Sequence, residues 1–420
     1  MTPKVLVISN NCFSKTDSNG RTLGNFFLGW DKSCLAQFYI QNSQPDFDYC
    51  ENYFRVTDAQ ALSALKTGKC SGGIVEKPQE DPQKSAGQGA SKSKRNALTM
   101  TARNMVWQAG MWQKCGFWQW VAEFAPDVVL LQAGDCAFMY RLAAKVAKKH
   151  NAKLVIYNSE AYYFKNFDYF RSAGLAKLLY PFFRMDLRKA LRKAYRAAAY
   201  IIYLCDSLKR SYDQEFSAPS ETIYTASELR AGATEKNNPV FTVSYCGNLG
   251  LDRHKGLMDI AQALQEISKD IYVDVYGRAG ENVIEDFAGC SGIRYHGLIP
   301  YEQVKSVMYG SDLILHIESF DDFYREDLKF AFSTKIADSL SCGTCFLLYA
   351  PENLACSQYL TEHKAGYVVS RKEDLADVLK QLITEPEARS KYVARALALA
   401  EKNHRAETNK KRFQDILRGL

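Results

Sequence analysis

A short segment around residue 335 combines residue types that suit a phosphate and a ribose. It contains Ser333, Thr334 and Lys335, then Asp338, and it reaches a glycine at Gly343. A helix that begins near Ser333 would put Lys335 and Asp338 about one turn apart, and its first amides would attract an anion. The lysine adds a point charge, and the carboxylate can accept hydrogen bonds from ribose hydroxyls. This is the chemistry of a nucleotide-sugar site; the alternative is an ordinary amphipathic helix with both side chains in solvent.

The loop after the first apolar run is a second candidate. It starts at Ser9 and contains Gly20 and Gly24, ahead of a helix expected through Phe26 and Leu28. Glycines allow tight turns and close approach of a ligand to the backbone. No GK[ST] follows, so the loop is not a P-loop. The alternative is a plain turn between a strand and a helix.

Carboxylates also follow apolar runs in the first half of the chain. Glu160 comes after KLVIYN, Asp135 after DVVLLQ and Asp206 after IIYLC. Ligands of open α/β sheets gather at such strand ends. Glu160 is suited to accept the proton of an incoming hydroxyl or to hydrogen-bond a sugar. For Asp206 we favour a helix N-cap.

Short apolar runs alternate with longer amphipathic segments, as is typical of parallel α/β units. The expected strands are KVLVIS, DVVLLQ, KLVIYN and YIIYLC, then FTVSYC, YVDVYG, GIRYHG, DLILHI and CFLLYA. A chain of 420 residues favours two domains, and the polar stretch KNNPVF separates the two sets of runs. We predict an α/β protein with doubly wound domains at 1–235 and 240–400. A polar stretch at about 76–97 is expected to be a mobile loop.

Composition excludes several classes of protein. The hydrophobic fraction is 47% and the charged fraction is 24%, as in folded soluble proteins. No apolar run is long enough to span a membrane, and we expect no cleaved signal peptide. The 12 cysteines form no CxxC pair and lie often in apolar runs, so we expect buried thiols in a reducing cytoplasm. A net charge of +7 is too small to argue for nucleic acid, and the histidines have no metal-binding spacing.

The segment 177–196 is basic and aromatic at once. It reads KLLYPFFRMDLRKALRKAYR and contains a single acid, Asp186. One interpretation is a helix on a membrane surface, with apolar side chains among the headgroups and the cations against anionic lipid. The other is a solvated helix with snorkelling side chains, which needs no partner.

Several segments, taken in chain order, resemble GT-B glycosyltransferases and family 4 in particular. Asp338 stands where the pattern S-K-x-x-E-x-x-x-x-G has its glutamate, and Lys255 with Gly256 matches the end of G-R-L-x-x-x-K-G. Asn248 replaces the arginine of that pattern, and Phe330 replaces the first glutamate of the family's E-x7-E pair. The runs EFAPDVVLLQAGD and YHGLIPY, the latter followed by KSVMYGSDLIL, also resemble family segments. Together these matches cover nearly the whole chain.

The resemblance implies roles for residues of both halves. Lys255 and Lys335 would neutralise the leaving diphosphate, with Arg253 supplying the charge that is missing at Asn248. Asp338 would bind the ribose. Glu318 or Glu326 would reach the donor sugar, and the alternative for either is a surface carboxylate. The remaining residues expected around the donor and the reacting sugar are Gly20, Gly247, Asn248, Gly277, Ser333 and Thr334.

For the whole chain, the resemblance implies two Rossmann-like domains that face a central cleft, with a helix at about 402–420 crossing back onto the first. The activity implied is transfer of a sugar from a nucleoside-diphosphate sugar, with UDP favoured, to a hydroxyl of a glycan or lipid-linked acceptor. It would be retaining, need no metal and serve polysaccharide synthesis in the cytoplasm, at the inner face of the plasma membrane. The departures at Asn248 and Phe330 keep two alternatives open: a non-catalytic partner subunit that binds glycan or another transferase, and a sugar-nucleotide epimerase.

Overall fold

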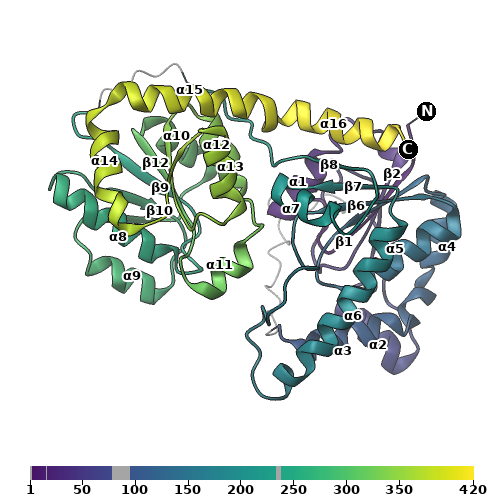
Figure 1. Ribbon diagram of the computed structural model, residues 1–420. Helices are drawn as coiled ribbons and strands as arrows, with labels where there is room; N and C mark the ends of the chain where they lie inside the picture. Colours follow the sequence, from purple (N-terminus) through teal and green to yellow (C-terminus); the bar gives the residue numbers. More distant parts are fainter. Residues whose placement is uncertain (1, 16, 78–94, 233–237) are drawn as a thin grey trace. The chain divides into compact units, whose positions relative to one another are not determined.

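The computed structural model describes residues 2–15, 17–77, 95–232 and 238–420, except the side chain of Ser18. Most of the loop expected at about 76–97, and part of KNNPVF, lie outside these residues. The chain divides into two compact units (Figure 1): Met1–Ile223 with Lys410–Leu420, and Tyr224–Asn409. The division therefore falls ahead of KNNPVF.

The first unit contains an eight-stranded sheet in the order β4-β3-β2-β1-β5-β6-β7-β8. Neighbouring strands pair in parallel except β3 and β4, which are antiparallel. The strands are β1 (Val5–Ser9), β2 (Leu35–Tyr39), β3 (Asn52–Arg55), β4 (Gly73–Val75), β5 (Val128–Gln132), β6 (Lys153–Asn158), β7 (Tyr200–Tyr203) and β8 (Ser220–Thr222). The helices are α1 (Ser18–Asn25), η1 (Lys32–Cys34), α2 (Asp58–Thr67), α3 (Ala97–Gln108), η2 (Met111–Cys115), α4 (Phe117–Phe124), α5 (Ala137–His150), α6 (Leu175–Ala197) and α7 (Asp206–Asp213).

The loop expected after the first strand is shorter than predicted. Asp17 caps α1 by accepting a hydrogen bond from the Gly20 amide, so both Gly20 and Gly24 lie inside the helix. A Cβ at Gly20 would lie 2.2 Å from the carbonyl oxygen of Cys12. Because that carbonyl fills the space, the glycine is required by packing of the helix against its own loop.

The end of the chain packs in the first unit. Phe413, on α16 (Ala406–Arg418), is fully buried and stacks on Phe26 with ring centroids 4.5 Å apart. Gln414 donates from Nε2 to the carbonyl oxygen of Phe26 at 3.0 Å. These contacts explain why residues 410–420 belong to this unit.

The expectation that every cysteine is a free thiol is wrong for one pair. Cys70 and Cys115 form a disulfide, with Cα atoms 5.3 Å apart. The pair joins the segment after α2 to the end of η2, and these two elements pack on each other. Since 45 residues separate the two cysteines, their spacing in the sequence carried no sign of the pairing. The other ten cysteines are free, and seven of them are buried.

The second unit contains a parallel six-stranded sheet in the order β11-β10-β9-β12-β13-β14. Its strands are β9 (Val243–Cys246), β10 (Val273–Tyr276), β11 (Ile293–Gly297), β12 (Leu313–Ile317), β13 (Cys345–Tyr349) and β14 (Tyr367–Val369). Its helices are α8 (Arg253–Ile267), α9 (Glu281–Ala288), α10 (Tyr301–Gly310), α11 (Asp322–Leu328), α12 (Thr334–Ser341), α13 (Ala355–His363), η3 (Lys372–Asp374), α14 (Leu375–Thr384) and α15 (Pro386–Asn403).

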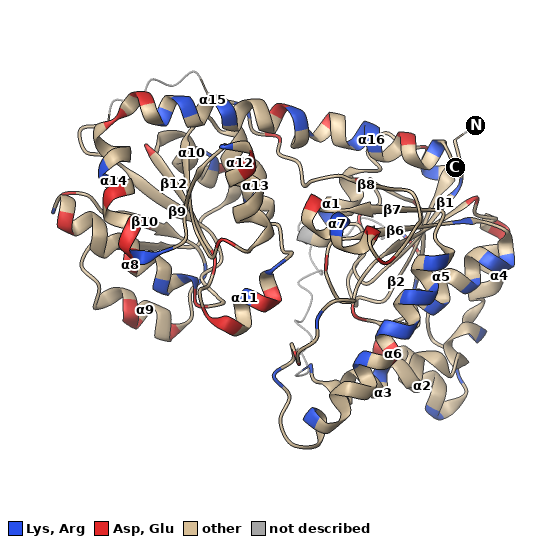
Figure 2. Ribbon diagram, viewed as in Figure 1, with Lys and Arg blue, Asp and Glu red and all other residues tan. Residues whose placement is uncertain are grey.

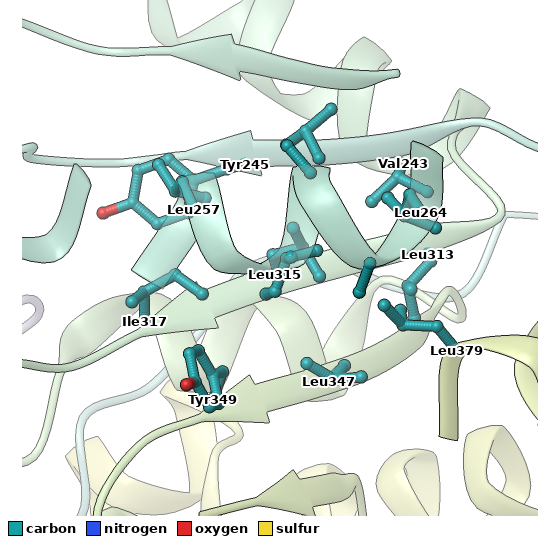
Figure 3. Close-up of a cluster of buried hydrophobic side chains, with 14 of the residues drawn as sticks. Val243, Tyr245, Leu257, Leu264, Leu313, Leu315, Ile317, Leu347, Tyr349 and Leu379 are labelled. Atoms are coloured by element: carbon teal, nitrogen blue, oxygen red, sulfur yellow. The ribbon is translucent and has the colours of Figure 1, made fainter. Parts of the chain in front are cut away.

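The core of the second unit explains why the sequences of its central strands are apolar throughout. Side chains from β9, β12 and β13 meet those of α8 and α14 on one face of the sheet (Figure 3). Because helices cover both faces of a parallel sheet, its central strands are buried on both sides. All five residues of β12 and all five of β13 are buried accordingly.

The strand order also predicts where a ligand would bind. From β9 the chain proceeds to β10 and β11 on one side, and from β12 to β13 and β14 on the other. The order therefore reverses between β9 and β12, and open α/β sheets bind ligands outside the carboxyl ends of the strands at such a point. Gly247 and Glu318 are the residues that follow these two strands.

Candidate functional site

Lys335 lies beside the backbone at the carboxyl end of β9. It is the second residue of α12, whose N-cap Ser333 accepts a hydrogen bond from the Lys335 amide at 3.3 Å. A Cβ built on Gly247 would lie 3.0 Å from Lys335 Nζ, which places the amine at the switch point. Burial, followed by repulsion from Arg253, lowers the pKa of Lys335 below its ordinary value. The amine forms no hydrogen bond or ion pair within the described residues.

Two glycines let the strand ends come together there. The Gly247 amide donates to the Tyr276 carbonyl oxygen at 2.8 Å, and the Gly277 amide donates to that of Gly297 at 2.8 Å. A Cβ at Gly277 would lie 1.8 Å from the Gly247 carbonyl oxygen, so no side chain fits at this position. The loop that follows is held by Asn248, whose Oδ1 accepts from the Gly250 amide at 2.9 Å. In this unit, Asn248 stabilises the turn that leads into α8.

Arg253 and Glu318 form a buried ion pair next to Lys335. Arg253 Nη2 lies 2.7 Å from Glu318 Oε2, and the side chains are 13% and 6% exposed. His316 Nε2 donates to the other carboxylate oxygen at 3.1 Å. Burial acts to raise the pKa of Glu318, but the hydrogen bonds from His316 and Arg253 and the charge of Arg253 outweigh it and leave that pKa below its ordinary value. Burial also lowers the pKa of His316, so the imidazole is neutral at pH 7.

Lys255 occupies a more open position than Lys335. Its side chain is 67% exposed, and Nζ lies 2.8 Å from the carboxylate of Asp252. Hydrogen bonding to Asp252 raises the pKa of Lys255. Lys255 and Glu318 line one pocket of about 330 Å³, together with Asp252, Gly256, Asp259, Ser319, Phe320, Asp321 and Tyr349. Lys255 is thus an exposed cation at the rim of the pocket and is already paired, whereas Lys335 is a partly buried cation.

Asp338 is held by a segment that the sequence did not connect with it. Ser227 donates from Oγ to Asp338 Oδ1 at 2.5 Å, and the Leu229 amide donates to the same hydroxyl at 3.1 Å. The Ser227 amide in turn donates to the carbonyl oxygen of His404 at 2.9 Å. His404 is fully buried and donates from Nδ1 to the Thr225 carbonyl oxygen at 2.7 Å.

The candidate residues of the first unit lie at strand ends. Glu160 follows β6; its carboxylate is 42% exposed and lies 3.7 Å from Lys165 Nζ. Asp135 follows β5, is almost fully buried and is paired with Arg95. Asp206 does not cap α7, because Cys205 is the N-cap and Asp206 is the first helical residue.

The second unit therefore brings together most of the residues that sequence reasoning selected there. Gly247, Gly277, Arg253, Glu318 and Lys335 gather at the carboxyl ends of β9, β10 and β12. Ser333 is the N-cap of α12, and the exposed Thr334 is the first residue of the helix. The sequence analysis did not select His316 or Ser227. The one sequence signal for His316 was its position two residues before Glu318, which places both side chains on the same face at the end of β12.

Comparisons with known proteins agree with this fold. The family model described as Glycosyl transferase-like matches residues 253–418, which is less than half of the chain. No curated protein matches the chain.

Solved structures resemble it along their full length. Anabaena HepE in complex with UDP has a TM-score of 0.63 at 12% identity, covering 99% of this chain and 100% of that one. WaaG, a glycosyltransferase involved in lipopolysaccharide biosynthesis, has a TM-score of 0.60 at 12% identity with the same coverage. The lipopolysaccharide outer core galactosyltransferase WaaB, in its apo form, has a TM-score of 0.60 at 13% identity, covering 99% of this chain and 100% of that one. The chain has the GT-B fold, with two Rossmann-like domains.

Proposed function

We propose that the protein is a glycosyltransferase that moves a sugar from a nucleoside-diphosphate sugar to a hydroxyl of a glycan or lipid-linked acceptor. The match of residues 253–418 to a glycosyltransferase-like family and the likeness to transferase structures support this proposal. The observation that carries it is the amine of Lys335, partly buried beside Gly247 with an adjacent guanidinium. Two neighbouring cations at a switch point suit a diphosphate.

The chemistry assigned to the second unit is stabilisation of the leaving group. As the bond between the anomeric carbon and the diphosphate oxygen breaks, negative charge grows on that oxygen. Lys335, Arg253 and the first amides of α12 oppose this charge in a poorly solvated environment, where such interactions are strong. Lys255 adds charge at the rim. In this proposal the counter-charge comes from the protein's own cations.

The acceptor hydroxyl attacks the anomeric carbon from the side on which the diphosphate departs, which retains the configuration. Its proton passes to an oxygen of the leaving phosphate, so the protein needs no nucleophile of its own. Glu160, just after β6, is the candidate group that hydrogen-bonds the acceptor hydroxyl; in the alternative assignment Glu160, and not the phosphate, takes the proton. Asp338 is assigned to the ribose. The Ser227 hydroxyl, which donates to the Asp338 carboxylate, must then leave that carboxylate or share it with the ribose.

The test is a screen of UDP-, GDP-, dTDP- and ADP-sugars for release of the free nucleoside diphosphate. The structural neighbour HepE was solved with UDP and with UDP-glucose, so UDP-glucose comes first. We expect Lys335→Ala to lower turnover by about 100-fold, because it removes charge stabilisation of the transition state. Asp338→Ala is expected to weaken donor binding by about tenfold. Lys380→Ala, an exposed lysine on α14 of the same unit, is the matched control.

Two alternatives give different results in this screen. A non-catalytic partner subunit would show no thermal shift with any of the nucleotides, and the hydrogen bond that already occupies Asp338 favours it. An epimerase would convert its sugar nucleotide in the absence of any acceptor. If none of the sugar nucleotides is cleaved in the presence of any acceptor tested, the transferase proposal is refuted.

We further propose that α6 contacts an anionic membrane surface. The solvent-facing side of its first half is largely apolar: Leu175, Leu178, Phe182 and Met185 are each more than 60% exposed, next to the exposed Lys177. The second half of α6 contains many basic residues (Figure 2). Met185, Arg188, Lys189, Arg192, Lys193 and Arg196 line a pocket of about 440 Å³. Among the described residues, no helix is both long and apolar enough to cross a bilayer. An apolar end beside a basic end fits the headgroup layer of anionic lipid.

Vesicle sedimentation tests this surface. The protein is expected to bind vesicles with anionic phosphatidylglycerol better than vesicles of phosphatidylcholine alone, and salt should weaken the binding. Leu178→Gln together with Phe182→Gln should reduce binding, whereas Leu298→Gln, at a residue of the second unit that is 69% exposed, should not. Equal binding to both kinds of vesicle, or no effect of the α6 variant, would contradict the assignment.

A further inference from the structure

Glu318 is the most enclosed carboxylate at the candidate site. The residue is 5% exposed and follows β12 directly, and His316 on the same strand is 3% exposed. Residues two apart on a strand point to the same face, so the imidazole and the carboxylate lie next to each other. Arg253, at the start of α8, reaches this pair from the other side of the switch point.

Both oxygens of the Glu318 carboxylate are already used. Oε2 accepts from Arg253 Nε at 3.1 Å and from Nη2 at 2.7 Å, while Oε1 accepts from His316 Nε2 at 3.1 Å. Arg253 Nε also donates to the carbonyl oxygen of Ile317 at 3.1 Å. Three hydrogen bonds therefore fix the carboxylate, and only Oε1 keeps an acceptor position that a sugar hydroxyl could use. The guanidinium, in contrast, keeps Nη1 without a hydrogen bond to the described residues.

We infer that His316 and Glu318 are positioning residues that orient Arg253 toward the donor diphosphate, and that Glu318 does not bind the donor sugar. This inference rests on the proposed function. It gives Arg253 the charge role that the family pattern assigns to an arginine at position 248, where this chain has Asn248.

Charge balance gives a reason for the arrangement. Arg253 and Lys335 lie close enough for the guanidinium to lower the lysine pKa, and Glu318 acts in the opposite sense. Without the carboxylate, two cations would face each other in a poorly solvated place, which is costly. Glu318 therefore allows both cations to stand near the same anion while it fixes the geometry of one of them. His316 fixes the carboxylate in turn.

The experiment compares affinities for a nucleoside diphosphate and for its sugar nucleotide. UDP and UDP-glucose are the first probes, followed by GDP and GDP-mannose, measured by calorimetry on the full chain. Glu318→Gln is expected to weaken binding of both probes by the same factor, about tenfold, because Arg253 contacts the part that they share. Direct contact of Glu318 with the sugar would instead weaken only the sugar nucleotide, and that result would overturn the inference.

A double-mutant cycle supplies the second readout. If Glu318 acts through Arg253, then Arg253→Ala with Glu318→Gln should bind UDP no more weakly than Arg253→Ala alone. Additive losses would overturn the inference. His316→Leu should lose part of the UDP affinity that Glu318→Gln loses. His316→Gln keeps a donor near the position of Nε2 and should bind UDP like the wild type. If both predictions fail, His316 does not position Glu318.

Controls separate this inference from folding and from the proposed function. Glu373→Gln, an exposed glutamate of η3, should leave both affinities unchanged. Thermal unfolding shows whether Glu318→Gln has lost its fold. If it has, the affinities of His316→Gln for the two probes are measured instead. A wild-type chain that binds none of the probes would overturn the proposed function together with this inference. If the wild type binds the probes and Glu318→Gln loses affinity only for the sugar nucleotide, this inference is overturned and the proposed function stands.

Discussion

Acidification should destabilise the second unit through one histidine. His404 lies between α15 and α16, is fully buried, and bonds neutral groups on both ring nitrogens: the Thr225 carbonyl oxygen at 2.7 Å and the Tyr359 hydroxyl at 2.9 Å. Burial, with a smaller repulsion from His363, lowers the pKa of His404 from 6.5 to about 4. Protonation would put a charge in the core and remove the acceptor for Tyr359.

The size of the effect follows from linkage. Above pH 6.5 the ring is neutral in the folded and the unfolded chain, so the histidine makes no pH-dependent contribution. As the pH falls below 6.5, the unfolded chain takes up a proton that the folded chain refuses until about pH 4. The free energy of unfolding should thus fall by about 2 kcal/mol between pH 7 and pH 5, and by roughly 3 kcal/mol in total once the pH is below 4.

Urea unfolding at pH 7 and pH 5, followed by a probe of the second unit, tests this value. His404→Asn keeps a donor toward Thr225 but cannot titrate, so its stability at pH 7 should fall while its further loss on acidification should be about 2 kcal/mol smaller than that of the wild type. His363→Asn, at a partly exposed position on α13, removes only the smaller repulsion, so its loss on acidification should stay close to that of the wild type. Equal losses in the wild type and His404→Asn would refute the reasoning.

Three further predictions follow from local contacts. Lys335→Met should raise the stability of the nucleotide-free protein by about 1 kcal/mol while lowering turnover, because it removes a partly buried cation that has no bonded partner in the described residues; a fall in thermal stability would contradict this. Gly277→Ala should cost about 1–3 kcal/mol and impair nucleotide binding, because its Cβ would lie 1.8 Å from the Gly247 carbonyl oxygen. Gly310→Ala, with nothing within 4 Å of the added atom, should be nearly neutral in the same thermal assay. Thiol titration of the denatured, unreduced protein should detect ten thiols, and twelve only after reduction; twelve before reduction would exclude the Cys70–Cys115 disulfide in solution.

Most of the strands that sequence could predict are buried on both faces; β11, predicted from GIRYHG, is partly exposed. Runs such as LILHI in β12 and CFLLY in β13 are apolar throughout because helices cover both sides of the sheet. β2 (LAQFY) escaped prediction although it is equally buried. Its central Gln37 looks polar in sequence, but in the fold it donates to Ser9 Oγ at 2.8 Å and accepts from the Phe13 amide at 2.9 Å. A buried glutamine is tolerated where such partners exist, and they lie on segments distant in sequence.

The candidate site was predictable to a similar degree. The helix that starts after Ser333 followed from local residue types, and the gathering of strand ends followed from the general behaviour of parallel sheets. Which charges pair within that gathering depends on tertiary contacts. Arg253 and Glu318 are 65 positions apart, and Ser227 and Asp338 are 111 apart. No spacing rule connects such pairs, so sequence reasoning assigned Arg253, Glu318 and Asp338 to a ligand without seeing that each has a protein partner.

Those partners sharpen the argument for Lys335. Enclosed charges elsewhere in the described residues are compensated: Asp135 is paired with Arg95, and Glu318 with Arg253. A folded chain gains nothing in stability from an enclosed amine that bonds to no neighbour, because the desolvation of the charge is not repaid. In the proposed function the ligand that completes this group is an anion, which would lie near Gly247, the start of α12 and the guanidinium of Arg253. A diphosphate satisfies that requirement, and its departure from a sugar is the step at which the two cations would exert their largest effect.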